Sequence, residues 1–185
     1  MMNTTHGAVG AAMGSVVVLL APAFGTAAAV GAIAGSLLPD VDLFVGEHRR
    51  TLHFPVLGWL VALPALGLAV LAPSTASVAL AFFVLGLAVH SAMDAFGAGT
   101  EIRPWEATSD RSVYAHVPGT WLRARRWVRY DGAPEDLALC VFASLPALVL
   151  FEGPIRWLVL AGFLLSVLYT AFRKRIPELE ARFLG

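Results

Sequence analysis

Residues 78–96 read VALAFFVLGLAVHSAMDAF, and this stretch indicates both the fold class and the position of a candidate site. Every residue before His90 is apolar or glycine, which is typical of a helix that contacts lipid over most of its surface. His90 and Asp94 follow at the end of the run, four residues apart. Residues with this spacing lie side by side on one helix face. The stretch therefore predicts an apolar helix that ends in two possible metal ligands.

The composition of the chain predicts an integral membrane protein. Of its 185 residues, 58% are hydrophobic and 14% are charged, and the mean hydropathy is +0.73. A soluble domain has about a quarter of its residues charged, so the apolar surplus is expected to face lipid. The formal net charge is zero, which argues against a nucleic-acid partner attracted by a general positive field. The single cysteine, Cys140, excludes an intrachain disulfide, leaves the redox compartment open and is expected to be a buried thiol.

The apolar residues fall into six stretches separated by turn signals. Short segments with Pro or Gly follow the first, third and fifth stretches, and each favours a reversal of the chain. We therefore expect an all-α fold, a multi-pass transmembrane helical bundle that forms one integral membrane domain over residues 1–185, with about six helices in three hairpins. The stretches run roughly from Ala8 to Leu20, Ala27 to Leu38, Pro55 to Leu71, Val78 to Phe96, Leu137 to Phe151 and Ile155 to Phe172.

The first hairpin has a competing interpretation. Its two stretches are shorter than the roughly 20 residues of a full crossing, so residues 8–38 could form one kinked span instead. That arrangement would place His6 across the membrane from Asp40. The stretch from Met1 to Gly14 contains no Lys or Arg. Because a cleavable export signal starts with basic residues, we expect this stretch to belong to the mature protein.

The placement of charge favours the three hairpins. In that scheme 12 of the 13 basic residues lie on one side of the membrane, and Arg156 lies on the other. Glu152 is the one acidic residue of 13 that lies opposite. Positive charge in short loops is typical of the cytoplasmic face. We therefore expect a multi-pass protein of the cell membrane whose polar face is cytoplasmic, with its oligomeric state left open.

The connection between Gly97 and Asp136 is long for a compact domain, and connections of this length usually carry function. It contains WLRARRWVRY at residues 121–130, where aromatic and apolar side chains alternate with arginines. This pattern predicts a basic, aromatic helix that lies on anionic lipid headgroups. Nucleic-acid binding is the rival interpretation, and one short basic segment on a neutral membrane protein is weak support for it.

Two further motifs add possible metal ligands. LPDVD at residues 38–42 places Asp40 and Asp42 at alternate positions. In an extended or turn segment they would point to the same side and could bind one metal or bridge two, because carboxylates placed together repel without a cation. An ordinary Asp-rich turn is the alternative. HRRTLH at residues 48–53 places His48 and His53 just before a helix, with a spacing that suits loop ligands.

In the three-hairpin scheme these motifs meet at one membrane face. Imidazole and carboxylate ligands suit zinc best, with manganese or iron as alternatives, and no CxxC or HExxH motif competes with them. His116, in the long connection, is expected to be structural or to face the substrate. The candidate metal ligands are His6, Asp40, Asp42, His48, His53, His90 and Asp94.

The order of these motifs resembles a known family. TH at residues 5–6, LPDVD, HRRTLH and HSAMD at residues 90–94, followed by Gly97, Gly99 and RPW at 103–105, are similar to the motifs of the predicted membrane-bound metal-dependent hydrolases, the YdjM-like group. The resemblance covers about residues 4–105. It implies a distant similarity to zinc-dependent phospholipase C, whose helical fold holds metals with His and Asp side chains, and it matches all seven candidate ligands to polar positions of the family.

Several residues depart from the pattern of that family. Leu43 follows the second aspartate, where the family often has His. Arg50 replaces a glycine, and Leu52 and Phe54 replace small polar residues. These differences bear on the choice of substrate more than on metal retention.

A divalent ion at this face would activate water and polarise a phosphoryl or carbonyl oxygen. Asp42 or Glu47 could accept the proton of that water, and Arg49, with Arg50 and Arg103, could bind a phosphate through paired hydrogen bonds. The leading hypothesis is therefore metal-dependent hydrolysis of a lipid or other membrane-associated phosphoester.

Two other classes of function stay open. A metal-handling or ion-translocating protein would need polar residues that continue to the far side of the membrane. A non-catalytic scaffold would use the metal to hold its hairpins together, and would close the coordination sphere of that metal.

Overall fold

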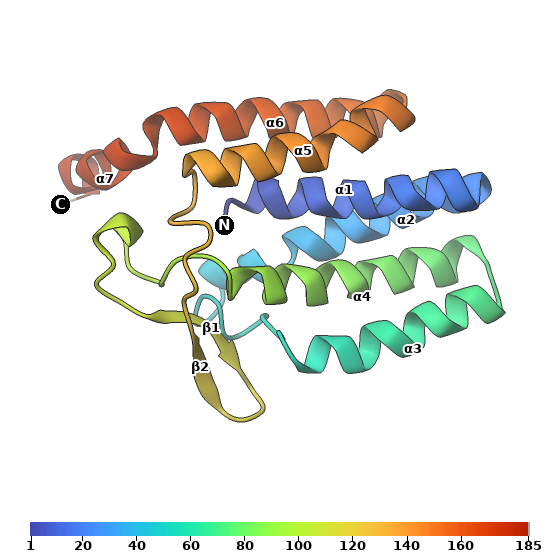
Figure 1. Cartoon of the computed structure of the whole chain (residues 1–185), viewed down its shortest axis with the longest axis horizontal. Helices are drawn as coiled ribbons and strands as arrows, with labels where there is room; N and C mark the ends of the chain where they lie inside the picture. The colour runs from blue at the N-terminus through green and yellow to red at the C-terminus, as the bar shows by residue number, and fades with distance from the viewer. Residues whose placement is uncertain (185) are drawn as a thin grey trace.

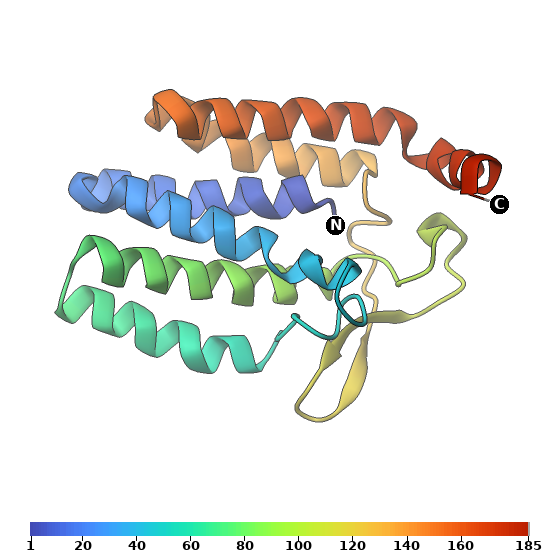
Figure 2. The same cartoon turned by 180° about the vertical axis from the view of Figure 1, so that it is seen from behind.

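The long helices of the chain lie roughly parallel to one another in an elongated bundle (Figures 1 and 2). The computed structural model describes residues 1–184, and the predicted helical bundle is confirmed. Helix α2 packs against α1 and α4, α3 packs against α4, and α5 packs against α1 and α6. The long helices are α1 (Asn3–Leu20), α2 (Pro22–Leu37), α3 (Leu57–Leu71), α4 (Thr75–Asp94), α5 (Pro134–Leu150) and α6 (Gly153–Phe172).

Short elements complete the chain. They are the 3₁₀ segments η1 (Pro39–Leu43), η2 (Pro104–Glu106) and η3 (Arg173–Arg175), the strands β1 (Arg111–Ala115) and β2 (Thr120–Arg123), and helix α7 (Ile176–Leu184). The strands pair in antiparallel fashion. Four stretches are long and apolar enough to cross a membrane, namely Asn3–Leu20, Pro22–Leu43, Thr75–Asp94 and Gly153–Leu179. Helix α3 is apolar but shorter.

The bundle has small residues inside and large apolar residues outside. Ala28 and Ala32 are fully buried, whereas Leu20 and Leu71 are 80% and 85% exposed. In water this arrangement would leave a large apolar surface exposed, which soluble monomers rarely do. In lipid it is favourable, because helices associate there through the close packing of small residues. The distribution of side chains thus agrees with the composition in indicating a membrane protein.

Helices α2 and α4 approach each other closely along a GxxxG motif, Gly31 to Gly35. A Cβ atom added at Gly35 would lie 1.9 Å from the carbonyl oxygen of Phe83, and one added at Gly31 would lie 2.1 Å from the carbonyl oxygen of Ala79. No side chain fits at either position, so glycine is required. Because α2 leads into Asp40 and α4 carries His90, this contact positions the two halves of the candidate site.

The breaks between helices have local causes. Ala21 has a non-helical backbone with φ −149° and ψ 74°, and Pro22 then opens α2, a favoured position for proline. The chain reverses there, so α1 and α2 lie side by side (Figure 1). Before α4, Ser74 and Ser77 form a reciprocal capping box, which satisfies amide groups at the helix start.

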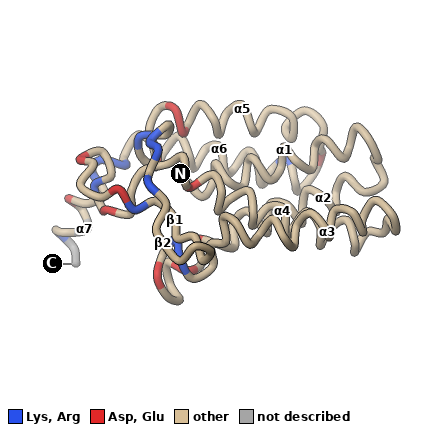
Figure 3. Tube along the Cα trace, turned by 60° about the horizontal axis from the view of Figure 1, so that its bottom comes forward, with Lys and Arg blue, Asp and Glu red and all other residues tan. Residues whose placement is uncertain are grey.

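The two ends of the bundle differ in length of connection and in charge. Residues 38–56 and 95–133 connect helices at one end, where most of the Lys, Arg, Asp and Glu residues gather (Figure 3). At the other end the connections are short, and the α5–α6 turn there contains Glu152. The long, charged connections therefore lie together at a single end of the bundle, which we call the polar end.

The basic segment at residues 121–130 is not the helix that its composition predicts. Its first part forms β2, and Arg126 has a positive φ of 53°, which a helix does not accommodate. The amide groups of Arg125, Arg126 and Val128 donate hydrogen bonds to the carbonyl oxygens of Ala95, Gly97 and Phe96. The segment thus satisfies carbonyl groups just beyond α4, and this long-range pairing outweighs its local preference for helix.

Candidate metal centre

Four of the seven candidate ligands meet at the polar end of the bundle. Asp40 comes from η1, His53 from the segment before α3, and His90 and Asp94 from the last turns of α4. One ligand atom of each lies within 4.8 Å of the others. His53, His90 and Asp94 are buried, and Asp40 is partly exposed. This cluster of Asp40, His53, His90 and Asp94 could hold a metal ion, as the sequence predicts.

The spacing of the donor atoms matches that of a small tetrahedral site. Metal–ligand distances of about 2.0–2.1 Å, typical of zinc, place neighbouring donors about 3.4 Å apart. Here Nε2 of His53 lies 3.2 Å from Nε2 of His90 and 3.2 Å from Oδ2 of Asp94. Nε2 of His90 lies 3.5 Å from that oxygen and 3.4 Å from Oδ1 of Asp40, and Nε2 of His53 lies 3.7 Å from Oδ1 of Asp40. Five of the six donor separations are therefore close to the value for a small tetrahedral ion, and the sixth, between Asp40 and Asp94, is within 4.8 Å.

Hydrogen bonds on the outer side of each imidazole direct its inner nitrogen toward the cluster. Nδ1 of His90 donates to the carbonyl oxygen of Ser36 at 2.6 Å, and Nδ1 of His53 donates to the carboxylate of Asp42 at 2.8 Å. In a neutral ring the opposite nitrogen is then an acceptor. In that state two imidazole lone pairs and two carboxylates face one another. A cation among them would reduce the repulsion between these acceptors.

Asp42 supports the cluster from outside it. Asp40 and Asp42 were expected to point to the same side, on the assumption of an extended segment, but the segment is the 3₁₀ helix η1. Residues two apart in a 3₁₀ helix point in different directions. Oδ2 of Asp42 accepts hydrogen bonds from His53 and from the amide of Leu52, and Oδ1 lies 2.9 Å from Nδ1 of His48. Asp42 therefore orients histidines, the usual role of a carboxylate behind a metal ligand.

His48 lies outside the four-donor cluster and is connected to it through Asp42. Its Nδ1 faces Asp42, so that its Nε2 is left as an acceptor. Burial lowers the pKa of His48, although the hydrogen bond to Asp42 acts in the opposite direction. The ring is therefore neutral near pH 7. A neutral imidazole held by a carboxylate is suited to accept a proton.

His6 lies against the cluster from α1. Its ring stacks on that of His90 at a centroid distance of 3.7 Å, and its Nε2 lies 3.4 Å from Oδ1 of Asp94. The side chain is buried, and neither ring nitrogen makes a hydrogen bond within residues 1–184. His6 is thus brought to the same end as Asp40, beside the four donors rather than among them.

Of the arginines considered for phosphate binding, Arg49 alone is beside the cluster. Its Nε lies 3.6 Å from Oδ2 of Asp94, and its Nη1 donates to the carbonyl oxygen of Ala98 at 2.8 Å. The amide of Tyr114 in β1 donates to the carbonyl oxygen of Arg49, so the β-hairpin supports this position. Arg50 and Arg103 are exposed and pair with Glu47 and Glu106. Glu47 is therefore directed away from the cluster.

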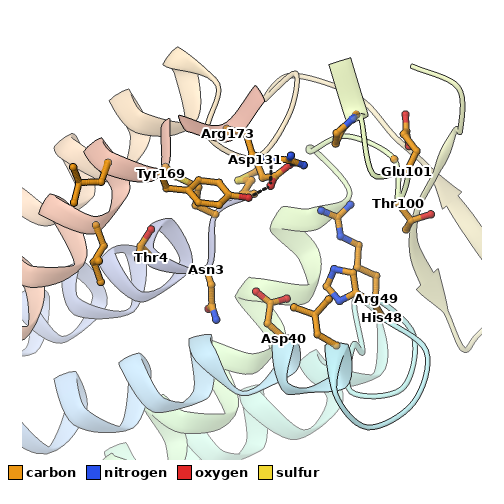
Figure 4. A pocket seen from close by; sticks show the side chains of 17 residues that line it. Asn3, Thr4, Asp40, His48, Arg49, Thr100, Glu101, Asp131, Tyr169 and Arg173 are labelled. Atoms are coloured by element: carbon orange, nitrogen blue, oxygen red, sulfur yellow. Dashed lines mark hydrogen bonds and ion pairs between the residues drawn. The ribbon is translucent and has the colours of Figure 1, made fainter. Parts of the chain in front are cut away.

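A cavity of about 610 Å³ opens beside the cluster (Figure 4). Asp40, His48 and Arg49 line one part of it, and Asp131, Tyr169 and Arg173 line another. Asp40 is the one member of the cluster that reaches this cavity within the described residues. An ion held by the cluster would therefore be approached from the side of Asp40.

The second wall of the cavity was not predicted from the sequence. Arg173 donates to both carboxylate oxygens of Asp131, and Tyr169 donates to the same carboxylate. The buried Asp136, which accepts hydrogen bonds from the hydroxyl of Thr5 and the amide of Gly132, was not predicted either. A short polar segment just before an apolar stretch was the available signal, and it is not specific.

His116, which was expected to be structural or to face the substrate, lies beside Arg50. Its Nε2 is 2.9 Å from the carbonyl oxygen of Arg50, and its ring stacks on that of Phe54. These contacts connect the β-hairpin to the segment that carries His48 and His53.

Comparison of the chain with protein-family models, with curated proteins and with solved structures gives no match. The function must therefore be inferred from the cluster and its cavity.

Proposed function

We propose that this protein is a membrane-embedded, metal-dependent hydrolase that acts on a lipid or other membrane-associated phosphoester. The observation that carries the proposal is the convergence of two imidazole nitrogens and two carboxylates at spacings suited to one small divalent ion. Zinc is the leading metal, with manganese or iron as alternatives. Membership of the YdjM-like group is part of the same proposal, supported by the order of the His and Asp motifs.

The cavity supports an amphipathic substrate. Beside Asp40, His48 and Arg49 it is lined by Leu165 and Leu168 of α6, which are 58% and 57% exposed on the outer surface of the bundle. The positive charge of Arg49 would attract a phosphate, and Leu165 and Leu168 would contact the apolar part of the same molecule.

A bound divalent ion would polarise the phosphoryl group and make water more acidic. His48 is the residue best placed to take the proton of that water, because it lines the cavity, is neutral and is held by Asp42. The two bases considered from sequence are less suited to this role. Both oxygens of Asp42 already accept hydrogen bonds, and Glu47 is paired with Arg50.

Two measurements test the proposal. Protein purified in detergent is expected to contain metal and to hydrolyse a phosphatidic acid or a phosphodiester lipid when zinc or manganese is supplied. His48→Gln should keep its metal and lose about 10²–10⁴-fold in rate, the usual contribution of general base catalysis. Asp110→Asn, an exposed aspartate at the same end of the bundle, is the matched control. Loss of metal in His48→Gln would instead make His48 a ligand.

Ion translocation is disfavoured by the interior of the bundle. Away from the polar end, the buried polar side chains of the described residues include Ser15 and Ser144, and both bond to carbonyl groups of their own helix. A route for ions across the membrane would need polar groups that are free to bind them.

A structural metal is the second candidate function, because four protein donors at tetrahedral spacing favour a closed site. Replacement of the bound metal by cobalt distinguishes a structural site from a catalytic one. Addition of inorganic phosphate should change the visible spectrum of the cobalt protein if a position facing the cavity is open, and should leave it unchanged if the site is closed.

We also propose that the six long helices cross the membrane as three hairpins, with the polar end in the cytoplasm. The support is the gathering of basic residues at that end. Cysteines introduced at the exposed residues Glu152 and Arg129 test the orientation. An impermeant maleimide applied to intact cells should label Glu152→Cys and should reach Arg129→Cys after lysis. The reverse result would invert the topology.

A further inference from the structure

A second, apolar cavity lies among α1, α2, α5 and α6. It has a volume of about 190 Å³ and is lined by Gly7, Leu37, Leu158 and Gly162 among others. We call it the slot. Glycines on two of its walls leave space that side chains would otherwise fill. A Cβ atom added at Gly162 would have no heavy atom within 4 Å, other than the excluded neighbours on its own helix.

The slot adjoins the polar cavity beside the metal cluster. Thr4 and Leu165 line both. The polar cavity carries Asp40 and Arg49, whereas the slot is bordered mainly by aliphatic side chains and glycine. A molecule that occupied both would need a charged head joined to a hydrocarbon tail.

The wall formed by α6 is on the lipid side of the bundle. Leu158 and Leu165 line the slot and are 54% and 58% exposed. A tail could therefore enter the slot sideways from the bilayer without crossing a polar layer. Because the slot has less than a third of the volume of the polar cavity, it suits one chain rather than two.

We propose that the slot binds one hydrocarbon chain of the substrate while its phosphate lies in the polar cavity next to Asp40 and Arg49. This inference rests on the proposed hydrolase function and names the substrate class as a long-chain lipid phosphoester. The slot then selects for the chain, and the metal cluster selects for the head.

Gly162→Leu tests the slot, because leucine at this position fills the open space and favours helix formation over glycine. Gly67→Leu is the matched control. Gly67 is also a helical glycine with no heavy atom within 4 Å of an added Cβ, and it lies in α3, away from the slot. Both variants should retain the metal content and unfolding temperature of the wild type.

The readout is the ratio of kcat/KM for dioleoyl phosphatidic acid to that for its water-soluble dihexanoyl analogue. In Gly162→Leu this ratio should fall about tenfold, the change expected when roughly two methylene groups lose their apolar contacts. In Gly67→Leu it should stay at the wild-type value. An equal ratio in all three proteins would overturn the proposal.

Photolabelling separates the failure of the slot from the failure of the hydrolase. The probe is phosphatidic acid with a diazirine in one acyl chain, reconstituted with the protein in phosphatidylcholine nanodiscs. The proposal expects label on residues 158–165 of the wild type, reduced in Gly162→Leu and displaced by unlabelled phosphatidic acid but not by diacylglycerol. Such labelling without hydrolysis would retain the slot and reject the enzyme. Labelling that is indifferent to the head group would mean ordinary surrounding lipid and would reject the slot.

Discussion

The two ends of the bundle are built on the same apolar helices and differ in the segments that connect those helices. At the far end the chain turns within a few residues, and the turns do little more than satisfy helix ends, as at Ser74. At the polar end the connections are long and bury charged side chains, including Asp42, Arg49 and Asp94. Burial of charge is costly unless partners are present. The far end thus contributes mainly to stability. The polar end buries charged groups beside partners, such as Arg49 next to Asp94, and a bound cation would add to those partners.

The largest expected effect is at the polar end. The double variant His90→Ala and Asp94→Asn removes two of the four donors in the cluster. Bound metal, measured by elemental analysis of protein purified in detergent, should fall to background. Glu152→Gln at the far end should retain the wild-type amount. If the double variant keeps its metal, the cluster is not the binding site.

A smaller effect is expected from Asp42→Asn. Asp42 fixes the ring of His53 without being among the four donors. Loss of such a supporting carboxylate weakens metal binding by about 10–100-fold, which a competition titration with a chromophoric chelator measures. The exposed pair Asp110 and Arg123 offers a comparison, because Asp110→Asn should leave the affinity unchanged. A complete loss of metal in Asp42→Asn would place Asp42 among the direct ligands.

Gly35 tests whether the packing of α2 against α4 affects metal binding at the polar end. A valine there would force α2 away from α4, since the carbonyl oxygen of Phe83 occupies the position of its Cβ. Overpacking of this kind costs about 1–3 kcal/mol in stability, and it should also move Asp40 away from His90. We expect a lower unfolding temperature together with weaker metal binding. Gly67→Val should show neither change, and intact metal affinity in a destabilised Gly35→Val would mean that the two ends are independent.

The smallest effect is expected at the far end. Ser74→Ala removes the capping box that precedes α4. The free energy of unfolding, measured with denaturant in mixed micelles, should fall by about 1 kcal/mol. Metal content and hydrolysis should not change. A loss of metal in this variant would show that the far end reaches the site.

Local sequence rules identified part of the site and could not identify the rest. His90 and Asp94 were predictable because helical periodicity alone places them together. Asp40 and His53 were predictable as candidates, but their meeting with α4 depends on the close approach of helices. The division of roles between Asp40 and Asp42 was not predictable, because it depends on η1 being a 3₁₀ helix rather than an extended turn.

The long connection at residues 95–133 shows another limit of prediction from sequence. Its aromatic and basic residues favour a helix on the membrane surface, whereas the structure uses their backbone amides to bind carbonyl groups at the end of α4. Such hydrogen bonds join residues about thirty positions apart, and composition does not reveal them. The bundle itself was easier to predict, since most of the apolar stretches are continuous and are separated by clear turn signals.

The glycine contact between α2 and α4 has a consequence for the membrane that hosts the protein. Two helices in backbone contact respond to a thinner or thicker bilayer by tilting together, so the donors that they carry would keep their mutual distances. Helix α6 is held less firmly, since only 17% of an 18-residue apolar window within Gly153–Leu179 is buried. Bilayer thickness would therefore shift the wall of the cavity before it disturbed the metal. Lipid composition could thus change which molecules reach the site while the ion stays in place.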